Sequence, residues 1–194
     1  MKAERKGFLI AVNKMVLLVL AFLTLIVVVF SAYRIFMTRL YPLKYKEQIC
    51  YYADYYNLDR ALIFSVIKTE SNFDKNAVSN AGAVGLMQIT EKTGEYIGAK
   101  LGVGSYQLIN ENDNINFGCY YINYLLAKFN NVQTALVAYN AGEGNVIKWL
   151  KDKSLSDDGI SLKTIPYIET REYIKKINKN FSKYKELYKN FLDK

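Results

Sequence analysis

Glu70 stands where an apolar segment changes into a loop rich in small and polar residues. The run "IKTESNFDKNAVSNAGAVGLMQIT", residues 67–90, reaches its first acid at this position. Glu70 follows Ile63 by seven residues and Ile67 by three, so on a helix it continues the apolar face. Burial disfavours the charged form of a carboxyl group and raises its pKa. A carboxylic acid that is neutral near pH 7 can serve as the general acid in cleavage of a glycosidic bond.

A buried helix must position this acid. The segment 60–70 is apolar around much of its circumference, and Asp59 precedes it as an expected N-cap. The loop that follows contains Gly82 and Gly85, which permit tight turns. We therefore expect the helix to raise the pKa of the acid, and the loop to form one wall of a substrate groove.

Helical patterns account for most of the remaining chain. Apolar residues recur at helical spacing, and no strand or internal repeat is apparent. The expected helices run from Pro42 to about Asn57, from Thr90 to about 101, and over 114–129, 132–140 and 146–150, with a long one after Pro166. The sequence predicts a single, mainly α (all-α) domain behind an N-terminal apolar segment.

Composition excludes several kinds of chemistry. The chain has no His, which removes Ser-His-Asp and Cys-His nucleophiles and His-dependent metal motifs. We expect no metal and no cofactor. Cys50 and Cys119 form an even pair in a chain that we expect to leave the cytosol, and both a disulfide and two separate thiols fit.

The positive charge of the chain lies at its ends. The net charge is +8, but residues 42–150 hold nine basic and ten acidic side chains. Residues 1–41 carry six basic side chains against one acidic, and residues 151–194 carry eleven against seven. Nucleic-acid binding requires a clustered basic face with interleaved aromatic residues, so we expect no nucleic-acid partner.

An uncharged stretch of nineteen residues, 15–33, has the length of a membrane span. Four basic residues precede it, as in a cytoplasmic flank, and Arg34 and Arg39 follow it. We expect residues 1–41 to form a basic cytoplasmic tail with an uncleaved signal anchor, and residues 42–194 to form an extracytoplasmic catalytic domain in a single-pass protein of the cell membrane. A cleaved signal peptide and an anchor facing the cytoplasm are the alternatives.

Four blocks together resemble the signature of the soluble lytic transglycosylase family, bacterial enzymes that cleave peptidoglycan. The first contains Glu70, Ser71, Phe73, Ala77, Ser79 and Gly85 to Ile89. The others are "NINFGCYYINYLL", "ALVAYNAGEGNVIKW" and "IPYIETREYIKKI", in the family's order. One departure is Glu91, which stands where the family often has proline.

The resemblance implies a lysozyme-like fold with a glycan groove and a defined reaction. The expected reaction cleaves the β-1,4 bond between N-acetylmuramic acid and N-acetylglucosamine and leaves a 1,6-anhydromuramic end. Glu70 matches the single catalytic acid/base. The positions that match substrate-binding residues are Ser71, Met87, Gln88, Tyr139, Asn140 and Glu169. The implied partners are peptidoglycan glycan strands, together with the membrane through one helix.

Two other functions fit the same motifs. A muramidase, a true hydrolase on this scaffold, would need a positioned water and usually a second acid. The available carboxylates are Asp74, Glu91, Glu143 and Glu169, and spacing alone selects none of them. A non-catalytic protein that binds glycan during wall assembly is the other alternative.

Overall fold

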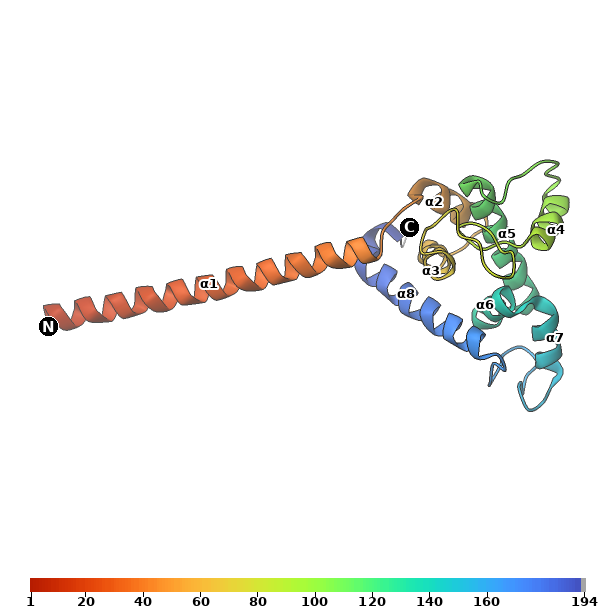
Figure 1. Cartoon of the computed structure of the whole chain (residues 1–194). Helices are drawn as coiled ribbons and strands as arrows, with labels where there is room; N and C mark the ends of the chain where they lie inside the picture. Colours follow the sequence, from red (N-terminus) through yellow and green to blue (C-terminus); the bar gives the residue numbers. More distant parts are fainter. Residues whose placement is uncertain (193–194) are drawn as a thin grey trace. The chain divides into compact units, whose positions relative to one another are not determined.

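The computed structural model describes residues 1–192, which are almost entirely helix and loop (Figure 1). The chain divides into two compact units, Met1–Pro42 and Leu43–Lys194, next to the predicted boundary. Residues 193–194 of the predicted catalytic region lie outside the described residues. Within the described part there is no strand, and the only β-type pairings are two isolated bridges, Val78 to Val84 and Val84 to Ile89. The predicted mainly α class is therefore confirmed.

The first unit is a single long helix, α1, Lys2–Leu40. Its part Arg5–Leu40 is long and apolar enough to cross a membrane, and its most apolar stretch is not buried by other parts of the protein. The predicted span 15–33 lies wholly inside it. A helix of this length exceeds the roughly 20 residues needed to cross a hydrocarbon core.

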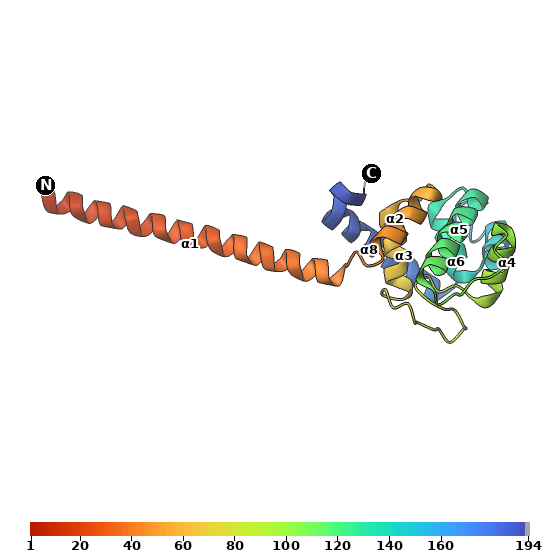
Figure 2. The same ribbon diagram turned by 90° about the horizontal axis from the view of Figure 1, so that it is seen from above.

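Seven helices build the second unit within its described residues. They are α2 Lys46–Tyr55, α3 Arg60–Glu70, α4 Glu91–Leu101, α5 Glu111–Phe129, α6 Val132–Ala141, α7 Glu143–Lys151 and α8 Ile168–Leu192. Helix α3 packs against α2 and α8, α6 packs against α5, α7 and α8, and α5 also contacts α2 and α4 (Figures 1 and 2). All residues from Ala61 to Ile67 of α3 are buried, so this helix forms the centre of the core.

Side-chain caps set several helix starts. As predicted, Asp59 caps α3, and its carboxylate accepts hydrogen bonds from the backbone N–H groups of Ala61 and Leu62 at 2.7 and 3.3 Å. Thr90 likewise caps α4 where the sequence places that helix start. These polar side chains satisfy N–H groups that have no partner within the helix.

Four helix starts differ from the prediction, and one of them is α7, which begins at Glu143 instead of Val146. Helix α5 begins at Glu111 instead of Asn114, because the Asn110 side chain already caps it there. Pro42 does not open α2, since the turn into that helix is made by Tyr45 at a positive φ of 55°. Helix α8 begins two residues after Pro166.

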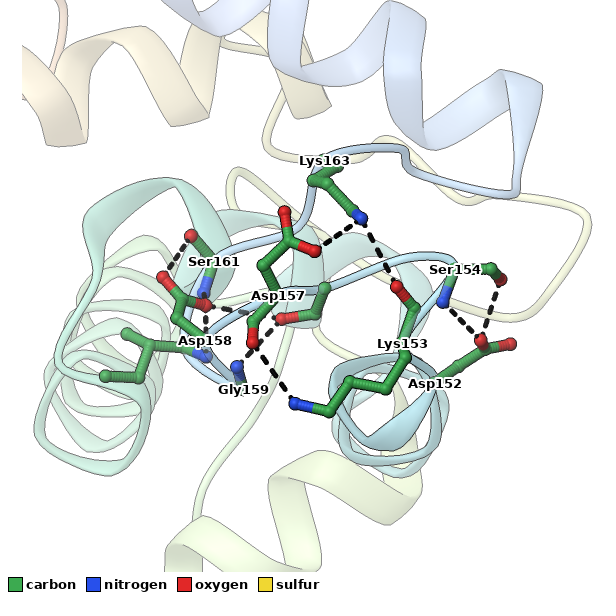
Figure 3. Close-up of polar contacts among 10 residues, drawn as sticks. Asp152, Lys153, Ser154, Asp157, Asp158, Gly159, Ser161 and Lys163 are labelled. Carbon is green, nitrogen blue, oxygen red and sulfur yellow. Dashed lines mark hydrogen bonds and ion pairs between the residues drawn. The ribbon is translucent and has the colours of Figure 1, made fainter.

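The loop between α7 and α8 is ordered by its own polar groups (Figure 3). The Asp158 carboxylate accepts hydrogen bonds from the Ser161 hydroxyl at 2.6 Å and from the backbone of Ser161 and Ile160, both at 2.8 Å, and these bonds hold the pKa of that carboxyl far below its usual value. Lys163 donates to Asp157 at 2.7 Å and to the Lys153 carbonyl at 3.2 Å. The loop thereby carries the chain back to the start of α8, which contributes side chains to the site described next.

Candidate active site

Glu70 is the last residue of α3, and one side of it stays accessible. The helix turns that precede it are fully packed, with Ile63, Val66 and Ile67 buried. Burial raises the pKa of the Glu70 carboxyl to about 7. The direction agrees with the expectation from the sequence, and it leaves a substantial protonated fraction at neutral pH.

A tyrosine from α8 holds the carboxyl group of Glu70. The Tyr173 hydroxyl donates a hydrogen bond to Glu70 Oε1 at 2.7 Å, and the Tyr173 side chain is buried. This hydrogen bond stabilises the carboxylate, so it lowers the pKa of Glu70 and partly offsets burial. Burial and the nearby charge of Glu70 raise the pKa of Tyr173 well above its usual value, so its hydroxyl remains a donor.

Glu169 lies one helical turn before Tyr173 on α8 and is exposed. Its negative charge adds to the rise in the pKa of Glu70. The structure therefore brings this predicted residue into the electrostatic neighbourhood of the acid. No hydrogen bond joins the two carboxyl groups.

The backbone reverses its direction immediately after Glu70. Asn72 and Phe73 both have positive φ, 50° and 64°, and the Phe73 side chain is buried beside Phe64 with ring centroids 6.3 Å apart. A bulky residue in the left-handed region is strained and persists only where packing fixes it. The burial of this ring keeps the loop start in place next to the acid.

The predicted substrate contacts Ser71 and Gln88 make hydrogen bonds that shape the loop. The Ser71 hydroxyl donates to the Leu86 carbonyl at 2.9 Å. The Gln88 amide donates to the carbonyls of Ala77 and Gly85 at 3.1 and 2.9 Å. Both side chains stay partly accessible, and their hydrogen bonds connect residues near the two ends of the segment 71–90.

Asn114, a buried residue of α5, clamps the same loop. Its amide nitrogen donates to the carbonyls of Val84 and Leu108 at 2.9 and 2.7 Å, and its oxygen accepts from the Met87 backbone at 2.7 Å. Gly85, at φ +81°, lies so close that a Cβ there would collide with the Asn114 side chain. The close approach of this loop to α5 therefore requires glycine at position 85.

Met87 and Tyr139 are joined through the loop backbone. The Tyr139 hydroxyl donates to the Met87 carbonyl at 2.7 Å, so it does not bond Glu70, as an orienting role would require. Glu70 is nevertheless close enough for its charge to add to the burial that raises the pKa of Tyr139. The Met87 side chain is fully buried against Gly118. The structure thus corrects the expectation for Met87, whose side chain supports the loop from within the core.

Asn140 links α6 to the start of α8. Its side-chain oxygen accepts a hydrogen bond from the Thr170 hydroxyl at 2.7 Å. Thr170 is buried and neighbours Glu169. Asn140 therefore helps to fix the turn of α8 that faces Glu70.

Reasoning from the sequence missed two residues of the site, Tyr173 and Asn114. Both lie inside the blocks that carry the family resemblance, Tyr173 in "IPYIETREYIKKI" and Asn114 at the head of "NINFGCYYINYLL". Their positions in those blocks were the available signal. Their partners are 103 and 27 residues away along the chain, so spacing could not reveal the contacts.

Tyrosine rings continue away from the acid. Tyr139 lies 5.6 Å from Tyr121, Tyr121 stacks on Tyr124 at 6.1 Å, and Tyr124 meets Tyr96 at 5.8 Å between ring centroids. The last three rings line a pocket of about 310 Å³. Lys128 forms an ion pair with Glu143, which also lines this pocket.

Neither a metal site nor a disulfide is present in the part of the chain that the structure describes. No group of three or more His, Cys, Asp or Glu side chains is arranged to hold a metal ion there. Cys50 is half-buried, Cys119 is buried, and the two thiols are unpaired. Burial raises the pKa of both, so neither is disposed to act as a thiolate.

The comparisons with known proteins decide the family. Residues 47–160 match the family described as Transglycosylase SLT domain. The chain belongs to the SLT transglycosylase family. A soluble lytic murein transglycosylase of Salmonella typhimurium is 31% identical to this SLT chain over 158 residues, which are 78% of the chain and 24% of the relative. A membrane-bound lytic murein transglycosylase C of Glaesserella parasuis is 31% identical over 157 residues, 68% of the chain and 43% of the relative.

Solved structures show the same SLT fold. The lytic transglycosylase Slt of Pseudomonas aeruginosa, determined as an inactive variant with glutamine in place of a glutamate, is 32% identical with a TM-score of 0.67 over 75% of this chain and 24% of its own. The 70-kDa soluble lytic transglycosylase of Escherichia coli is 26% identical with a TM-score of 0.67 over 77% of this chain and 25% of its own. The chain spans about a quarter of the length of these relatives.

Proposed function

We propose that this protein is a membrane-anchored peptidoglycan lytic transglycosylase with Glu70 as its single general acid/base. The observation that carries the proposal is a carboxyl group with a pKa of about 7, held by Tyr173 at the end of the central helix of an SLT fold. Relatives with this domain are named lytic murein transglycosylases. A carboxyl that titrates near pH 7 can both give and take a proton there.

The first step uses Glu70 as an acid. The protonated carboxyl transfers its proton to the oxygen of the β-1,4 bond between N-acetylmuramic acid and N-acetylglucosamine, and the bond from C1 of the muramic residue to that oxygen breaks. Tyr173 holds Oε1, so we assign the transferred proton to Oε2, the oxygen that this hydrogen bond leaves free for substrate. The N-acetylglucosamine side leaves with a new hydroxyl group.

The second step uses Glu70 as a base. The carboxylate takes the proton of the C6 hydroxyl of the same muramic residue, and O6 bonds to C1 to close the 1,6-anhydro ring. No water enters, and Glu70 returns to its protonated form. The hydrogen bond from Tyr173 is strongest to the carboxylate, so it stabilises the enzyme between the two steps.

The other predicted residues fall into two roles in this proposal. Glu169 and Tyr139 lie close enough to Glu70 for electrostatic coupling, and we assign to them contacts with the sugars next to the scissile bond. Ser71, Gln88 and Asn140 hold the loop and α8 in position, and their accessible surfaces add polar contacts to the glycan. Met87 acts only through its backbone and its packing.

A muramidase is the second candidate function, and it would need a second carboxylate near Glu70. Glu169 is the one carboxylate of the described residues whose charge shifts the pKa of Glu70, so it would have to supply the second acid. Its exposure suits a residue that contacts substrate more than one that activates a water in a closed site. Among the described residues, Glu70 is the one carboxyl group whose pKa is raised, and a single such acid favours the transglycosylase.

We place the second unit on the extracytoplasmic side, with α1 as a single-pass anchor. The basic residues before the apolar stretch support a cytoplasmic N-terminus. Relatives with similar domains are named membrane-bound. This placement also gives the domain access to the cell wall.

Purified peptidoglycan tests the proposed activity directly. The full-length chain in detergent micelles should release soluble muropeptides, and Glu70→Gln should reduce the rate by at least about a thousandfold because no other group can replace the proton donor. Glu169→Gln serves as the matched control and should keep measurable cleavage. Equal cleavage by the native chain and Glu70→Gln would refute the assignment of Glu70, and binding without cleavage by either chain would favour a non-catalytic glycan-binding protein. Loss of cleavage in both variants would favour the hydrolase.

A further inference from the structure

A second concave site lies between α2, α5 and the end of α4. It has a volume of about 290 Å³, and its walls include Tyr51, Tyr52, Tyr55, Tyr56, Asn116 and Leu101. None of these residues takes part in the site around Glu70. We call this site the α2 tyrosine pocket.

The α2 tyrosine pocket and the Glu70 loop contact opposite faces of α5. Successive residues of an α-helix are about 100° apart, so Asn114 and Gly118 lie on one face and Asn116 lies about 160° from both. Asn114 and Gly118 contact Met87 of the loop, whereas Asn116 faces α2. A ligand in the α2 tyrosine pocket would therefore bind away from the reaction centre.

Two tyrosines of this pocket form an exposed platform of two stacked rings. Tyr51 and Tyr55 are 62% and 68% exposed, and their rings are nearly parallel, with an interplanar angle of 17° and centroids 6.3 Å apart. Tyr52 and Tyr56 each stand edge-on to one of these rings at 4.9 Å. Tyr51 and Tyr55 bury little of their surface, so a role in core packing does not account for them.

The floor of the pocket is rigid and presents polar groups. The Tyr56 hydroxyl donates to Asn116 Oδ1 at 2.7 Å, which fixes both side chains. This arrangement leaves the amide N–H groups of Asn116 available as donors toward a ligand. Aromatic faces beside a few fixed polar groups are a typical composition for a ligand site.

Charge indicates the chemical class of the ligand. No lining side chain is charged at neutral pH, and burial raises the pKa of Tyr52 and Tyr56 above the usual value for a phenol. The lining therefore offers no ion-pair partner to a charged ligand. A neutral sugar ring, with an apolar face and hydroxyl groups at its edge, complements both the platform and the amide.

We propose that the α2 tyrosine pocket is a second carbohydrate site, which binds a neutral N-acetylhexosamine residue of a peptidoglycan strand. The identity of the glycan rests on the function proposed above. A strand held at this site keeps further sugars near Glu70 at a high effective concentration, so the site acts on long strands and not on short fragments.

The test measures binding of the full-length chain, in detergent micelles, to purified insoluble peptidoglycan. Glu70→Gln is used as the background so that no strand is cut during sedimentation. Adding Tyr51→Ala and Tyr55→Ala should weaken binding about tenfold, as expected when two stacked rings are lost. Tyr51→Phe with Tyr55→Phe retains the rings and should bind normally, and Val132→Ala controls for removal of an exposed apolar side chain elsewhere.

A kinetic measurement gives an independent result. With Glu70 intact, the double alanine variant should raise KM for the polymer and leave kcat unchanged, and it should cleave a short tetrasaccharide fragment at the native rate. Unchanged polymer binding in a folded alanine variant would overturn the proposal and assign the platform to a protein or lipid surface. A native chain that binds peptidoglycan through these tyrosines without cutting it would uphold this site and refute the proposed activity instead.

Discussion

At the scale of single residues, the account rests on opposing influences on one carboxyl group. Burial and the charge of Glu169 raise the pKa of Glu70, and the hydrogen bond from Tyr173 lowers it. The resulting value of about 7 lies close to the pH at which one group can act in turn as acid and base. This balance suggests experiments in which the two neighbours act in opposite directions.

The pH dependence of cleavage should shift in opposite directions in two variants. Protonated Glu70 starts the reaction, so kcat/KM should fall as pH rises through about 7. Glu169→Gln removes a like charge and should move this falling limb to lower pH. Tyr173→Phe removes a bond to the carboxylate and should move it to higher pH, each by up to about one unit. Shifts of the same sign in both variants, measured as pH profiles of kcat/KM, would contradict the account.

The same pKa predicts how stability depends on pH. The pKa of Glu70 is raised in the folded state from its ordinary 4.5, so the native state binds more protons between these two values. The free energy of unfolding should therefore fall as pH rises from about 4.5 to 7, and Glu70→Gln should remove this loss. We expect the variant to be more stable than the native chain by about 1–3 kcal/mol at pH 8, and to show no such gain at pH 4.

Thermal or denaturant unfolding of both chains at the two pH values measures this difference. A gain of equal size at both pH values would show that it comes from packing and not from ionisation. The stability difference between the two chains would then not depend on the ionisation of Glu70.

At the scale of elements, the cap of α3 determines where Glu70 lies. Asp59 caps this helix and also forms an ion pair with Lys185 at 2.9 Å. Asp59→Ala should lower the free energy of unfolding by about 1 kcal/mol, because two N–H groups at the helix start lose their acceptor. Asp59→Asn keeps a capping oxygen and removes the charge, so in urea unfolding it should retain most of the stability. An equal loss in both variants would assign the effect to the ion pair.

The loop beside Glu70 depends on one close contact with α5. A Cβ at Gly118 would overlap the Met87 side chain, including its Cβ at 2.8 Å. Gly118→Ala should cost about 1–3 kcal/mol and displace the backbone that Asn114 and Tyr139 hold, with a loss of cleavage. Gly144→Ala is the matched control, since that helical glycine has open space around it. A fully active, stable Gly118→Ala chain would show that the contact is not needed.

Local sequence patterns predicted elements better than contacts between them. The run 60–70 carries its own cap and apolar face, so its helix could be delimited to the residue. Helix α5 was predicted to start too late, because its first turn is polar and only the Asn110 cap marks it. The bond from Tyr173 to Glu70 joins residues 103 positions apart, and only the packing of α8 on α3 creates it. The family resemblance identified the acid, whereas its partner required the fold.

At the scale of the whole molecule, charge and hydropathy distinguish the two units of the chain. An apolar helix, α1, occupies the first unit, and the second unit contains the candidate site. The basic residues before the apolar stretch support the orientation that we propose, with the N-terminus in the cytoplasm.

Protease added to intact cells checks this orientation. Once the wall is opened, the second unit should be digested while a short N-terminal tag remains protected. The matched control is the same chain in cells whose membrane has been permeabilised, where the tag should also be lost. A second unit that is protected until permeabilisation would place it in the cytoplasm and contradict the proposed access to peptidoglycan.

Mass spectrometry of the products tests the central claim most directly. The full-length chain in micelles is incubated with purified peptidoglycan, and Glu70→Gln is the control. The account predicts disaccharide-peptides that are one water lighter than hydrolysis products, and their absence with Glu70→Gln. Products with ordinary reducing ends would contradict it, because a water and a second carboxylate would then have replaced the C6 hydroxyl as the group that completes the reaction.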